Sequence, residues 1–413
     1  MKLGLTDILK VFYAPHKVFK EIAQRPSYIA PLIVLIIFVI VQTGSSYVIA
    51  SQSLVEQTMP SGENGDIWTE NAAFWQANPG VAITNNTVDH LNSSASFYGG
   101  TIPYLGNGSI EFKADNNSII QIALATLDGS VNCGASGYKN LSFRVKIVEP
   151  SAIPDNVSIY LYSLNDFNSY TYDLTPEFAN SLVNIWNNIT IPVGSGDWST
   201  SGSPNWENIT SLQIIFTWQN ESSIDLLVDG LFFRGVYQDL LSFYGSTYMF
   251  SSLFGSVTTF LFHWIVLTAI IYLLVKGLKG SLEWKPLMIA IGVVLTILIV
   301  QALILIVSYS ALLNVHYPLE FIAGVPGESQ VASQAILESL ESLSLIIGAV
   351  QIAVLAWNAL LGVFVVRAVT AVAPATLDES VPSASKVFSW AKCFLISVAS
   401  VLLTLVVGYF LGF

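Results

Sequence analysis

The stretch Ser211–Gly235, SLQIIFTWQNESSIDLLVDGLFFRG, decides the fold class of this 413-residue chain. Apolar and polar residues alternate in two runs, the first from Leu212 to Trp218 and the second from Ile224 to Val228. A period of two is typical of β-strands that bury one face, and the letters QNES between the runs predict a turn. The stretch therefore predicts two half-buried strands of a β-sheet.

Further runs with the same period precede this stretch. In Asn140–Val148, for example, apolar residues alternate strictly with Ser142, Arg144 and Lys146. Short strands separated by turn-rich gaps predict an all-β sandwich or jelly roll over residues 106–238, with 51–105 as a linker and the start of the outer region. The predicted strands are Ser109–Lys113, Ser118–Thr126, Asn140–Val148, Val157–Ser163, Ser169–Leu174, Ile185–Val193, Ser211–Trp218 and Ile224–Phe233.

The average composition hides two very different parts. The chain is 53% hydrophobic and only 11% charged, with a mean hydropathy of +0.60, which is typical of a membrane protein. Residues 51–240 hold 19 Asp/Glu and 5 Lys/Arg, a net charge of −14, and the remainder holds 9 acidic and 11 basic residues, a net charge of +2. Nucleic-acid binding requires clustered Lys and Arg, so this distribution argues against it.

Five apolar runs are long enough to cross the hydrocarbon core of a bilayer. The first lies within 29–50 and the other four within 249–413. The first is too long for the apolar part of a signal peptide and has no small-residue cleavage site, so we expect a retained anchor. The runs are Pro31–Ala50, Met249–Val275, Pro286–Leu313, Leu343–Val366 and Ala391–Phe413.

The basic residues predict the orientation of these spans. All 11 that lie outside 51–240 fall in residues 1–28, 276–285 and 367–392, whereas the 314–342 connection has four Glu and no Lys or Arg. An N-terminus inside places every basic cluster in the cytoplasm, and it places residues 51–240 and the C-terminus outside. Residues 1–28 also carry apolar residues at helical spacing on either side of Pro15. They predict two short amphipathic helices on the cytoplasmic membrane surface or, alternatively, a partner-binding surface.

Glycosylation sequons agree with this orientation. Every Asn-x-Ser/Thr lies in the segment placed outside, which predicts an N-glycosylated protein of the cell surface. The two cysteines, Cys133 and Cys393, fall on opposite sides of the predicted membrane, so we expect no disulfide between them. The sequons are at Asn85, Asn92, Asn107, Asn116, Asn140, Asn156, Asn188, Asn208 and Asn220.

The start of the membrane part, Ala14–Val34 (APHKVFKEIAQRPSYIAPLIV), resembles the Yip family of five-span proteins, named for their interaction with Ypt/Rab GTPases. The similarity lies in a Pro, then Phe-x-x-Ile, then a polar break before the first span. It implies a five-span scaffold with the N-terminus inside, over about half of the chain. The large insertion after the first span departs from the compact family pattern. A glycosylated domain on such a scaffold indicates an archaeal envelope protein rather than a Golgi protein.

The insertion resembles carbohydrate-binding-module-like jelly rolls of the galactose-binding type. The similar segments are WNNITIPV (Trp186–Val193), GSPNWENITSLQIIF (Gly202–Phe216) and IDLLVDGLFF (Ile224–Phe233). The resemblance implies a jelly roll and places Asp229 near a structural calcium ion, for which carboxylate and carbonyl oxygens are suitable ligands. The alternative for Asp229 is a strand-end residue that makes only turn hydrogen bonds. The ligand is not implied, because many such modules bind no sugar.

Candidate ligand contacts are aromatic, because sugars stack on aromatic faces beside a few polar groups. Tyr160 and Tyr162 alternate with apolar residues and are predicted to point outward. Tyr170 and Tyr172 join them if the strand pairing is in register, whereas a one-residue shift sends both into the core. Trp198 lies in the loop GSGDWSTSG. The alternative for Tyr160 and Tyr162 is an ordinary surface or a contact with another subunit.

Four polar residues interrupt the predicted spans: His263, Gln301, Gln351 and Asn358. Gln351 and Asn358 are seven residues apart and are expected to share a helix face. Such residues either mark a route for a small solute or join helices by hydrogen bonds.

These observations predict a multi-pass α-helical membrane protein with five spans and a large inserted all-β jelly roll. The inserted segment has one histidine, His90, and no nucleophile motif, so we expect no enzyme. The leading hypothesis is a membrane-anchored surface protein that binds a surface glycan or envelope polymer, with structural Ca²⁺ as its one cofactor. The alternatives are a structural subunit whose β-domain packs on other envelope or membrane proteins, and transport of a small solute through the helices.

Overall fold

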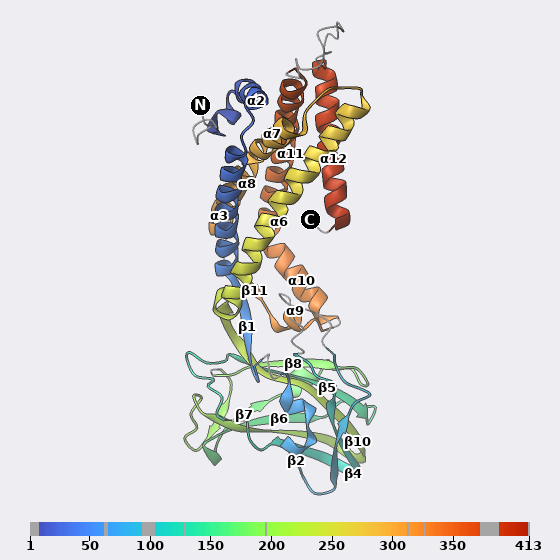
Figure 1. The fold of residues 1–413 in the computed structure, drawn as a ribbon. Coiled ribbons are helices and arrows are strands. Elements are labelled where there is room, and N and C mark those ends of the chain that lie inside the picture. Colours follow the sequence, from blue (N-terminus) through green and yellow to red (C-terminus); the bar gives the residue numbers. More distant parts are fainter. Residues whose placement is uncertain are drawn as a thin grey trace, which may run out of the picture. The chain divides into compact units, whose positions relative to one another are not determined.

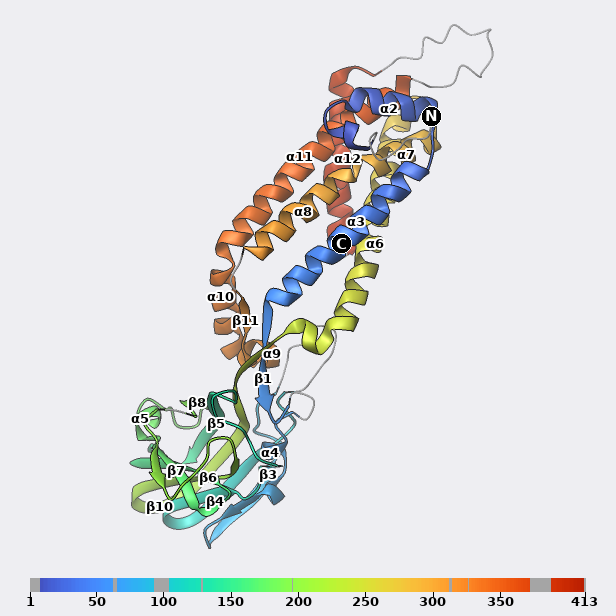
Figure 2. The ribbon, with the colours of Figure 1, turned by 90° about the vertical axis from the view of Figure 1, so that its left-hand side faces the viewer.

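The computed structural model describes residues 8–61, 65–92, 104–127, 129–194, 196–311, 314–325, 327–371 and 388–411. They form two compact units, each assembled from stretches that are distant in the sequence (Figures 1 and 2). A helical unit comprises Met1–Ser53, Asp239–Asn314 and Ser339–Phe413, and a β-unit comprises Leu54–Gln238 and Val315–Glu338. The predicted span ends Leu313 and Phe413 lie outside the described residues.

The helical unit contains long apolar helices at all five positions where the sequence predicts a span. Within the described residues, five helical stretches are long and apolar enough to cross a membrane, and the third is broken at Leu295 between α7 and α8. The elements of this unit are η1 (Lys10–Phe12), α2 (Pro15–Gln24), α3 (Ile29–Gln52), α6 (Leu240–Gly277), α7 (Trp284–Val294), α8 (Thr296–Ser310), α11 (Glu341–Ala371) and α12 (Trp390–Leu411).

The N-terminal segment packs against the helical unit through one face of α2. Pro15 opens this helix, where its missing N–H leaves no hydrogen bond unmade, and Val18, Phe19 and Ile22 are buried in the same apolar core as α7 and α11. The predicted amphipathic helix after Pro15 is thus confirmed. Of the one before it, the structure describes Ile8 and Leu9 as helical and the 3-10 helix η1 after them; residues 1–7 lie outside the described residues.

Strands of the β-unit follow most of the predicted alternation, with Ser109–Lys113 and Ser118–Thr126 joined into one long strand. The unit also holds α4 (Ile67–Glu70), η2 (Ala72–Phe74), α5 (Thr175–Phe178), α9 (Leu319–Ala323) and α10 (Glu328–Ser339) up to Glu338. Its strands are β1 (Ser53–Met59), β2 (Trp75–Ala77), β3 (Val81–Asn86), β4 (Ser109–Leu124), β5 (Asn140–Glu149), β6 (Asn156–Ser163), β7 (Asn165–Asp173), β8 (Asn187–Pro192), β9 (Ser199–Ser201), β10 (Ile209–Asp239) and β11 (Val315–Tyr317).

The strands make an antiparallel sandwich of two layers that share the long strands β4 and β10. The first layer runs β9-β7-β6-β10-β4-β2, using residues 209–217 of β10, and the second runs β8-β5-β10-β4-β3, using residues 224–234. In the first layer, Ile214 of β10 lies between Ile122 of β4 and Ile159 of β6. Apolar side chains from both layers face one core, which confirms the all-β sandwich.

The predicted QNES turn is instead a corner inside β10. The two runs of the opening stretch do not pair with each other. The pairing of β10 with β4 shifts register between Thr217 and Ser222, and the strand continues into the second layer. The corner carries β10 from one layer into the other, so that its apolar residues before and after the corner line opposite sides of one core.

Residues 51–105 are predicted as a linker and the start of the outer region, but residues 54–105 belong to the β-unit wherever they are described. Trp68 is only 2% exposed, and the indole N–H of Trp75 donates to the Trp68 carbonyl over 2.7 Å inside the core. The elements here are three to seven residues long, too short for a period to be recognised. The boundary predicted at Gly106 is therefore wrong, and the β-unit begins at Leu54.

Gly230 offers a test of packing at the bulge in β10. Its φ is +56°, and a Cβ atom there would lie 3.0 Å from Leu105 Cδ2 and 3.2 Å from Arg144 Cδ. We expect Gly230→Ala to lower the free energy of unfolding by about 1–2 kcal/mol, because the left-handed backbone and the close contacts both oppose a side chain. Chemical denaturation followed by tryptophan fluorescence measures this. Gly108→Ala, with only ordinary contacts, is the matched control, and equal stability of the two variants contradicts the expectation.

Candidate functional site

The outer face of the first layer is half-exposed along its length. Residues that point outward from β4, β6 and β10 alternate with fully buried ones, as predicted for Tyr160 and Tyr162. On β4, β6 and β10 this face carries amides and hydroxyls, and the neighbouring β7 adds the exposed carboxylates of Asp166 and Asp173. The strands of this layer contain no Lys or Arg in residues 119–124, 156–173 and 209–217. We call this surface the tyrosine face; it comprises Gln121, Ala123, Ser158, Tyr160, Tyr162, Ser211, Gln213 and Ile215.

Two parallel rings dominate the tyrosine face. The centroids of Tyr160 and Tyr162 lie 6.4 Å apart with an angle of 15° between the ring planes. The Tyr162 hydroxyl donates to Gln213 Oε1 over 2.8 Å, and this hydrogen bond fixes the side chains of Tyr162 and Gln213. Burial raises the pKa of Tyr162, and the nearby Asp166 carboxylate raises it further. The phenol therefore stays protonated at neutral pH, and the face combines aromatic surface with neutral donors and acceptors.

Tyr170 and Tyr172 do not join Tyr160 and Tyr162, because they lie on the opposite side of the strands. Tyr170 pairs with the inward-facing Leu161, and Tyr172 pairs with Ile159, which is the alternative register. The Tyr170 ring stacks on Trp206 with centroids 3.7 Å apart.

Trp198 belongs to the same inner cluster. Its indole is 9% exposed and donates to the Pro192 carbonyl over 2.8 Å. Its ring centroid lies 5.1 Å from that of Tyr172. Trp198 and Tyr170 are core residues here, and neither presents a ring to the surface.

Asp229 lies in a cluster of three carboxylates. Oxygen atoms of Asp66, Glu70 and Asp229 all lie within 4.8 Å of one another, and Asp66 and Asp229 are fully buried. Asp229 Oδ2 accepts from the Leu91 N–H over 2.7 Å, and Asp66 Oδ1 accepts from the Gly106 N–H over 2.9 Å. Within the described residues, none of the three forms an ion pair with a basic side chain.

Burial raises the pKa of both Asp66 and Asp229. The increase is larger for Asp229, because the adjacent Asp66 carboxylate disfavours a second negative charge. Neutralising such a pair takes either a proton or a cation. The donor set consists of hard carboxylate oxygens, each with a lone pair beyond its backbone hydrogen bonds, so it fits Ca²⁺. Asp66 and Glu70 lie in the stretch assigned to a linker, which is why the sequence indicated Asp229 alone.

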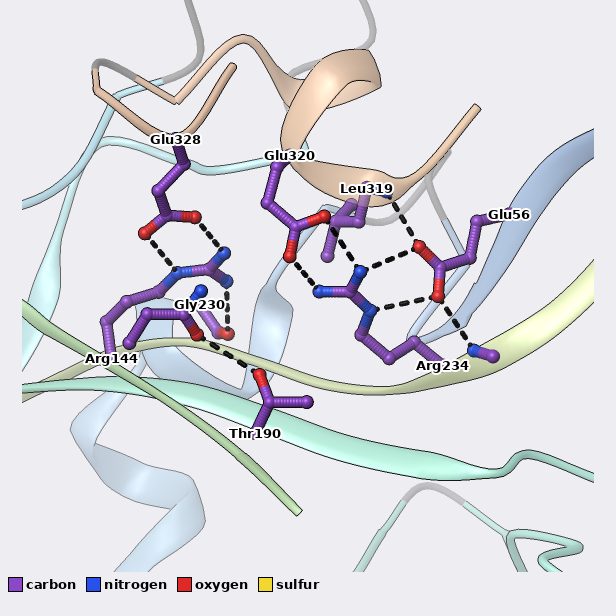
Figure 3. Close-up of polar contacts among 10 residues, drawn as sticks. Glu56, Arg144, Thr190, Gly230, Arg234, Leu319, Glu320 and Glu328 are labelled. Carbon is purple, nitrogen blue, oxygen red and sulfur yellow. Dashed lines mark hydrogen bonds and ion pairs between the residues drawn. The ribbon is translucent and has the colours of Figure 1, made fainter. Parts of the chain in front are cut away.

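Arg234 forms the centre of a second buried cluster (Figure 3). Its guanidinium makes two hydrogen bonds of 2.9 Å to Glu56 and pairs with both oxygens of Glu320. Glu56 also accepts from the N–H groups of Gly235, at 2.9 Å, and Leu319, at 2.7 Å. The Glu56 side chain is 1% exposed and that of Arg234 8%. We call Glu56, Arg234 and Glu320 the Arg234 cluster.

A second arginine attaches the chain segment that follows Glu320 to the second layer of the sandwich. Arg144 of β5 is fully buried and pairs with Glu328 at the start of α10, with Nη2 and Oε2 separated by 2.7 Å (Figure 3). Its Nη1 also donates to the Gly230 carbonyl. Beside it, Phe232 points away from the main core and packs with Leu319 and other apolar residues. The described part of 315–328 thus covers the outer face of the second layer around Arg144, Phe232 and Arg234, and the tyrosine face is half-exposed.

The sequence contains a feature that predicts these clusters, although the period-two alternation by itself does not reveal it. Arg144 and Arg234 interrupt strongly apolar strands, where a charge requires a partner. The 314–342 connection offers four Glu and no cation. Pairing these two observations predicts that the connection docks on the β-strands.

Polar residues in the helical unit do not gather. His263 bonds through Nδ1 to the Thr259 carbonyl of its own helix over 2.8 Å, and Gln301 is half-buried. Gln351 and Asn358 both lie on α11, seven residues apart, but Asn358 is buried whereas Gln351 is exposed. The reason is that α11 is largely exposed before Val354 and packed after it.

The predicted sequons lie at strand ends, corners and loops of the β-unit. Asn116 and Asn220 sit at the bends of β4 and β10, and Asn140 begins β5. None belongs to the tyrosine face. The side chains of Asn140 and Asn208 are half-buried, and the other seven are exposed.

Solved structures of carbohydrate-binding modules are similar to part of this chain. The family 11 module from Clostridium thermocellum, in complex with a β-1,3-1,4-mixed-linked tetrasaccharide, shares 15% identity with a TM-score of 0.27, over 44% of this chain and 95% of that one. The family 22 xylan-binding domain of Paenibacillus barcinonensis Xyn10C shares 13% identity with a TM-score of 0.25, over 43% and 90%. At these values the likenesses establish nothing about a ligand here. No family model matches the chain, and no curated protein matches it.

Proposed function

We propose that this protein is a membrane-anchored, non-enzymatic surface protein that binds a neutral glycan or envelope polymer on its tyrosine face. The observation that carries the proposal is the pair of parallel rings of Tyr160 and Tyr162, braced by the Tyr162–Gln213 hydrogen bond. Sugars stack on such rings and bond to amides and hydroxyls around them. A neutral polymer is favoured because this layer offers no basic side chain to an anionic one.

The proposal extends to the membrane. The five apolar helices would span a bilayer as a Yip-type scaffold, with the N-terminus in the cytoplasm and both the β-unit and the C-terminus outside. The sequons would then face an extracytoplasmic space, as in a glycosylated archaeal envelope protein. The Asp66–Glu70–Asp229 cluster would hold a structural Ca²⁺ ion remote from the bound glycan.

A panel of immobilised neutral and anionic glycans tests the proposal with the full-length protein in lipid nanodiscs. Saturable binding to at least one neutral glycan, with none to the anionic ones, supports it. No binding by a folded, monodisperse protein contradicts it. Copurification with fixed protein partners in mild detergent would then favour the structural-subunit alternative.

Tyr162→Ala is expected to weaken binding of the selected glycan by about 30-fold. A buried aromatic contact of this kind contributes about 2 kcal/mol, and each 1.4 kcal/mol is tenfold in Kd. Tyr162→Phe keeps the ring but loses the bond to Gln213, so a smaller loss is expected. Calorimetric titration measures both. Leu182→Ala removes an exposed apolar side chain outside the tyrosine face and serves as the control; equal losses in Leu182→Ala and Tyr162→Ala argue against this site.

A further inference from the structure

Basic side chains gather at one end of the helical unit. Figures 1 and 2 show α2, the beginning of α7, the end of α11 and the beginning of α12 at this end. The α6–α7 connection also lies here and carries Lys276 and Lys279. We call the following residues the basic end: Lys17, Lys20, Arg25, Lys276, Lys279, Lys285, Arg367 and Lys392.

Direct contacts hold these segments together. The Arg367 guanidinium lies 4.1 Å from the ring centroid of Trp390, which joins the end of α11 to the start of α12. Lys285 Nζ lies 6.0 Å from the ring centroid of Tyr28, which joins α7 to the segment before α3. The α6–α7 connection packs on the start of α12, because a Cβ atom on Gly280 would lie 2.7 Å from Phe388 Cζ.

Among the described residues, no carboxylate forms an ion pair with the basic end. The acidic residues that the structure describes in the same segments are Glu21 and Glu283, against eight basic ones. All members except the half-buried Arg367 are exposed. A concentration of unpaired cations on a folded surface favours an anionic partner.

Aromatic side chains mark the kind of partner. Trp284 is 39% exposed and Trp390 51%, and both lie where apolar helices meet the basic residues. Tryptophan and tyrosine favour the headgroup level of a bilayer, where one edge of the ring is apolar and the other is wet. A protein partner or free phosphate requires no such belt, whereas a lipid headgroup above its acyl chains does.

We propose that the basic end binds the phosphate groups of anionic lipids, with α2 lying against them. The proposal rests on the membrane insertion proposed above, and it adds a chemically defined partner for the inner surface. Lys17 and Lys20 on the exposed side of α2, together with Arg25, would contact headgroups directly. The buried Val18, Phe19 and Ile22 keep the helix on the protein, so the basic residues are presented by a fixed scaffold.

Lipid competition in nanodiscs tests this inference with the full-length protein. Retained lipid is counted by mass spectrometry after delipidation from discs that mix phosphatidylglycerol with phosphatidylcholine. We expect phosphatidylglycerol to be enriched, and we expect Lys17→Gln/Lys20→Gln to reduce the enrichment about 25-fold, at about 5-fold per lysine near the surface. Inorganic phosphate in solution should not compete.

Lys113→Gln/Lys139→Gln removes the same charge from the β-unit and is the matched control, expected to leave the enrichment unchanged. Equal retention of both lipids, an undiminished preference in Lys17→Gln/Lys20→Gln, or full competition by inorganic phosphate overturns the inference. These results leave the proposed membrane insertion intact. A protein that fails to enter any bilayer contradicts the insertion itself and the inference with it.

Discussion

Replacing Arg234 with methionine should lower the free energy of unfolding of the β-unit by about 3–5 kcal/mol. The variant leaves Glu56, whose side chain is 1% exposed, without its cation, and it also leaves Glu320 unpaired. For a unit of this size, the loss corresponds to a decrease in Tm on the order of 10 °C. Differential scanning fluorimetry of the full-length protein in detergent measures it.

Lys113→Met provides the matched control for the Arg234 cluster. Lys113 also bridges two carboxylates, Glu111 at 3.0 Å and Asp225 at 3.4 Å, but its side chain is 53% exposed. Such a pair contributes at most about 1 kcal/mol. Neutralising both carboxylates, in Glu56→Gln/Arg234→Met/Glu320→Gln, should recover part of the lost stability, because the cost arises from uncompensated buried charge. Equal stability of Arg234→Met and Lys113→Met contradicts the account.

The Arg234 cluster should also make the β-unit sensitive to acid. Burial alone would raise the pKa of Glu320, but hydrogen bonds from Arg234 outweigh burial and lower it. A carboxyl whose folded-state pKa is lowered stabilises the fold above its unfolded-state pKa, and that stabilisation is lost as pH falls through the folded-state pKa.

Calcium should stabilise the β-unit. Without Ca²⁺, the carboxylate cluster should make the β-unit more stable as pH falls, which is opposite to the effect of Glu320. At a free concentration of about 100 times the Kd, a single bound ion adds about 2.7 kcal/mol. In EDTA, the raised pKa values of Asp66 and Asp229 mean that stability increases as pH falls from 7 towards 5, because each folded-state carboxyl binds its proton more tightly than the unfolded one. Saturating Ca²⁺ should abolish this increase.

The variant Asp229→Asn tests whether stabilisation by Ca²⁺ depends on the Asp229 carboxylate. The amide removes one buried negative charge, so the variant should be at least as stable as the native protein in EDTA at pH 7 and should gain nothing from Ca²⁺. Glu221→Gln, at the exposed corner of β10, is the control and should keep the full Ca²⁺ response. Tm values at several pH values, with Ca²⁺ and with EDTA, measure all of these. If Ca²⁺ leaves the Tm of the native protein unchanged, the carboxylate cluster is not a calcium site.

The sequence predicted the elements whose residues repeat over a long enough run. The five long apolar helices appear where expected, and so does the alternation in β5, β6 and β10, because burial of one strand face leaves a regular pattern. Short elements leave none. Thus α4, with Asp66 just before it and Glu70 at its end, went unrecognised, and with it two of the three carboxylates of the candidate calcium site.

Strand register was the second feature that the sequence could not predict. The side on which Tyr170 and Tyr172 lie depends on how tightly the chain turns after β6, and a single residue reverses it. Here the pairing shifts between Tyr162 and Ser163, and Leu164 adopts a φ of +68°. A positive φ at leucine is uncommon and is not foreseen from sequence. Docking of Glu320 and Glu328 on the β-strands likewise depends on contacts far apart in the chain.

The most direct test of the proposed glycan site is an amide hydrogen–deuterium exchange map of the full-length protein, with and without saturating glycan selected from the panel. We predict slower exchange in Asn156–Ser163 of β6 and in residues 209–217 of β10, the strands that carry Tyr160, Tyr162 and Gln213. We predict no change in β5 or in residues 315–325. Protection confined to β5 and 315–325, or a panel in which no glycan binds, would contradict the account.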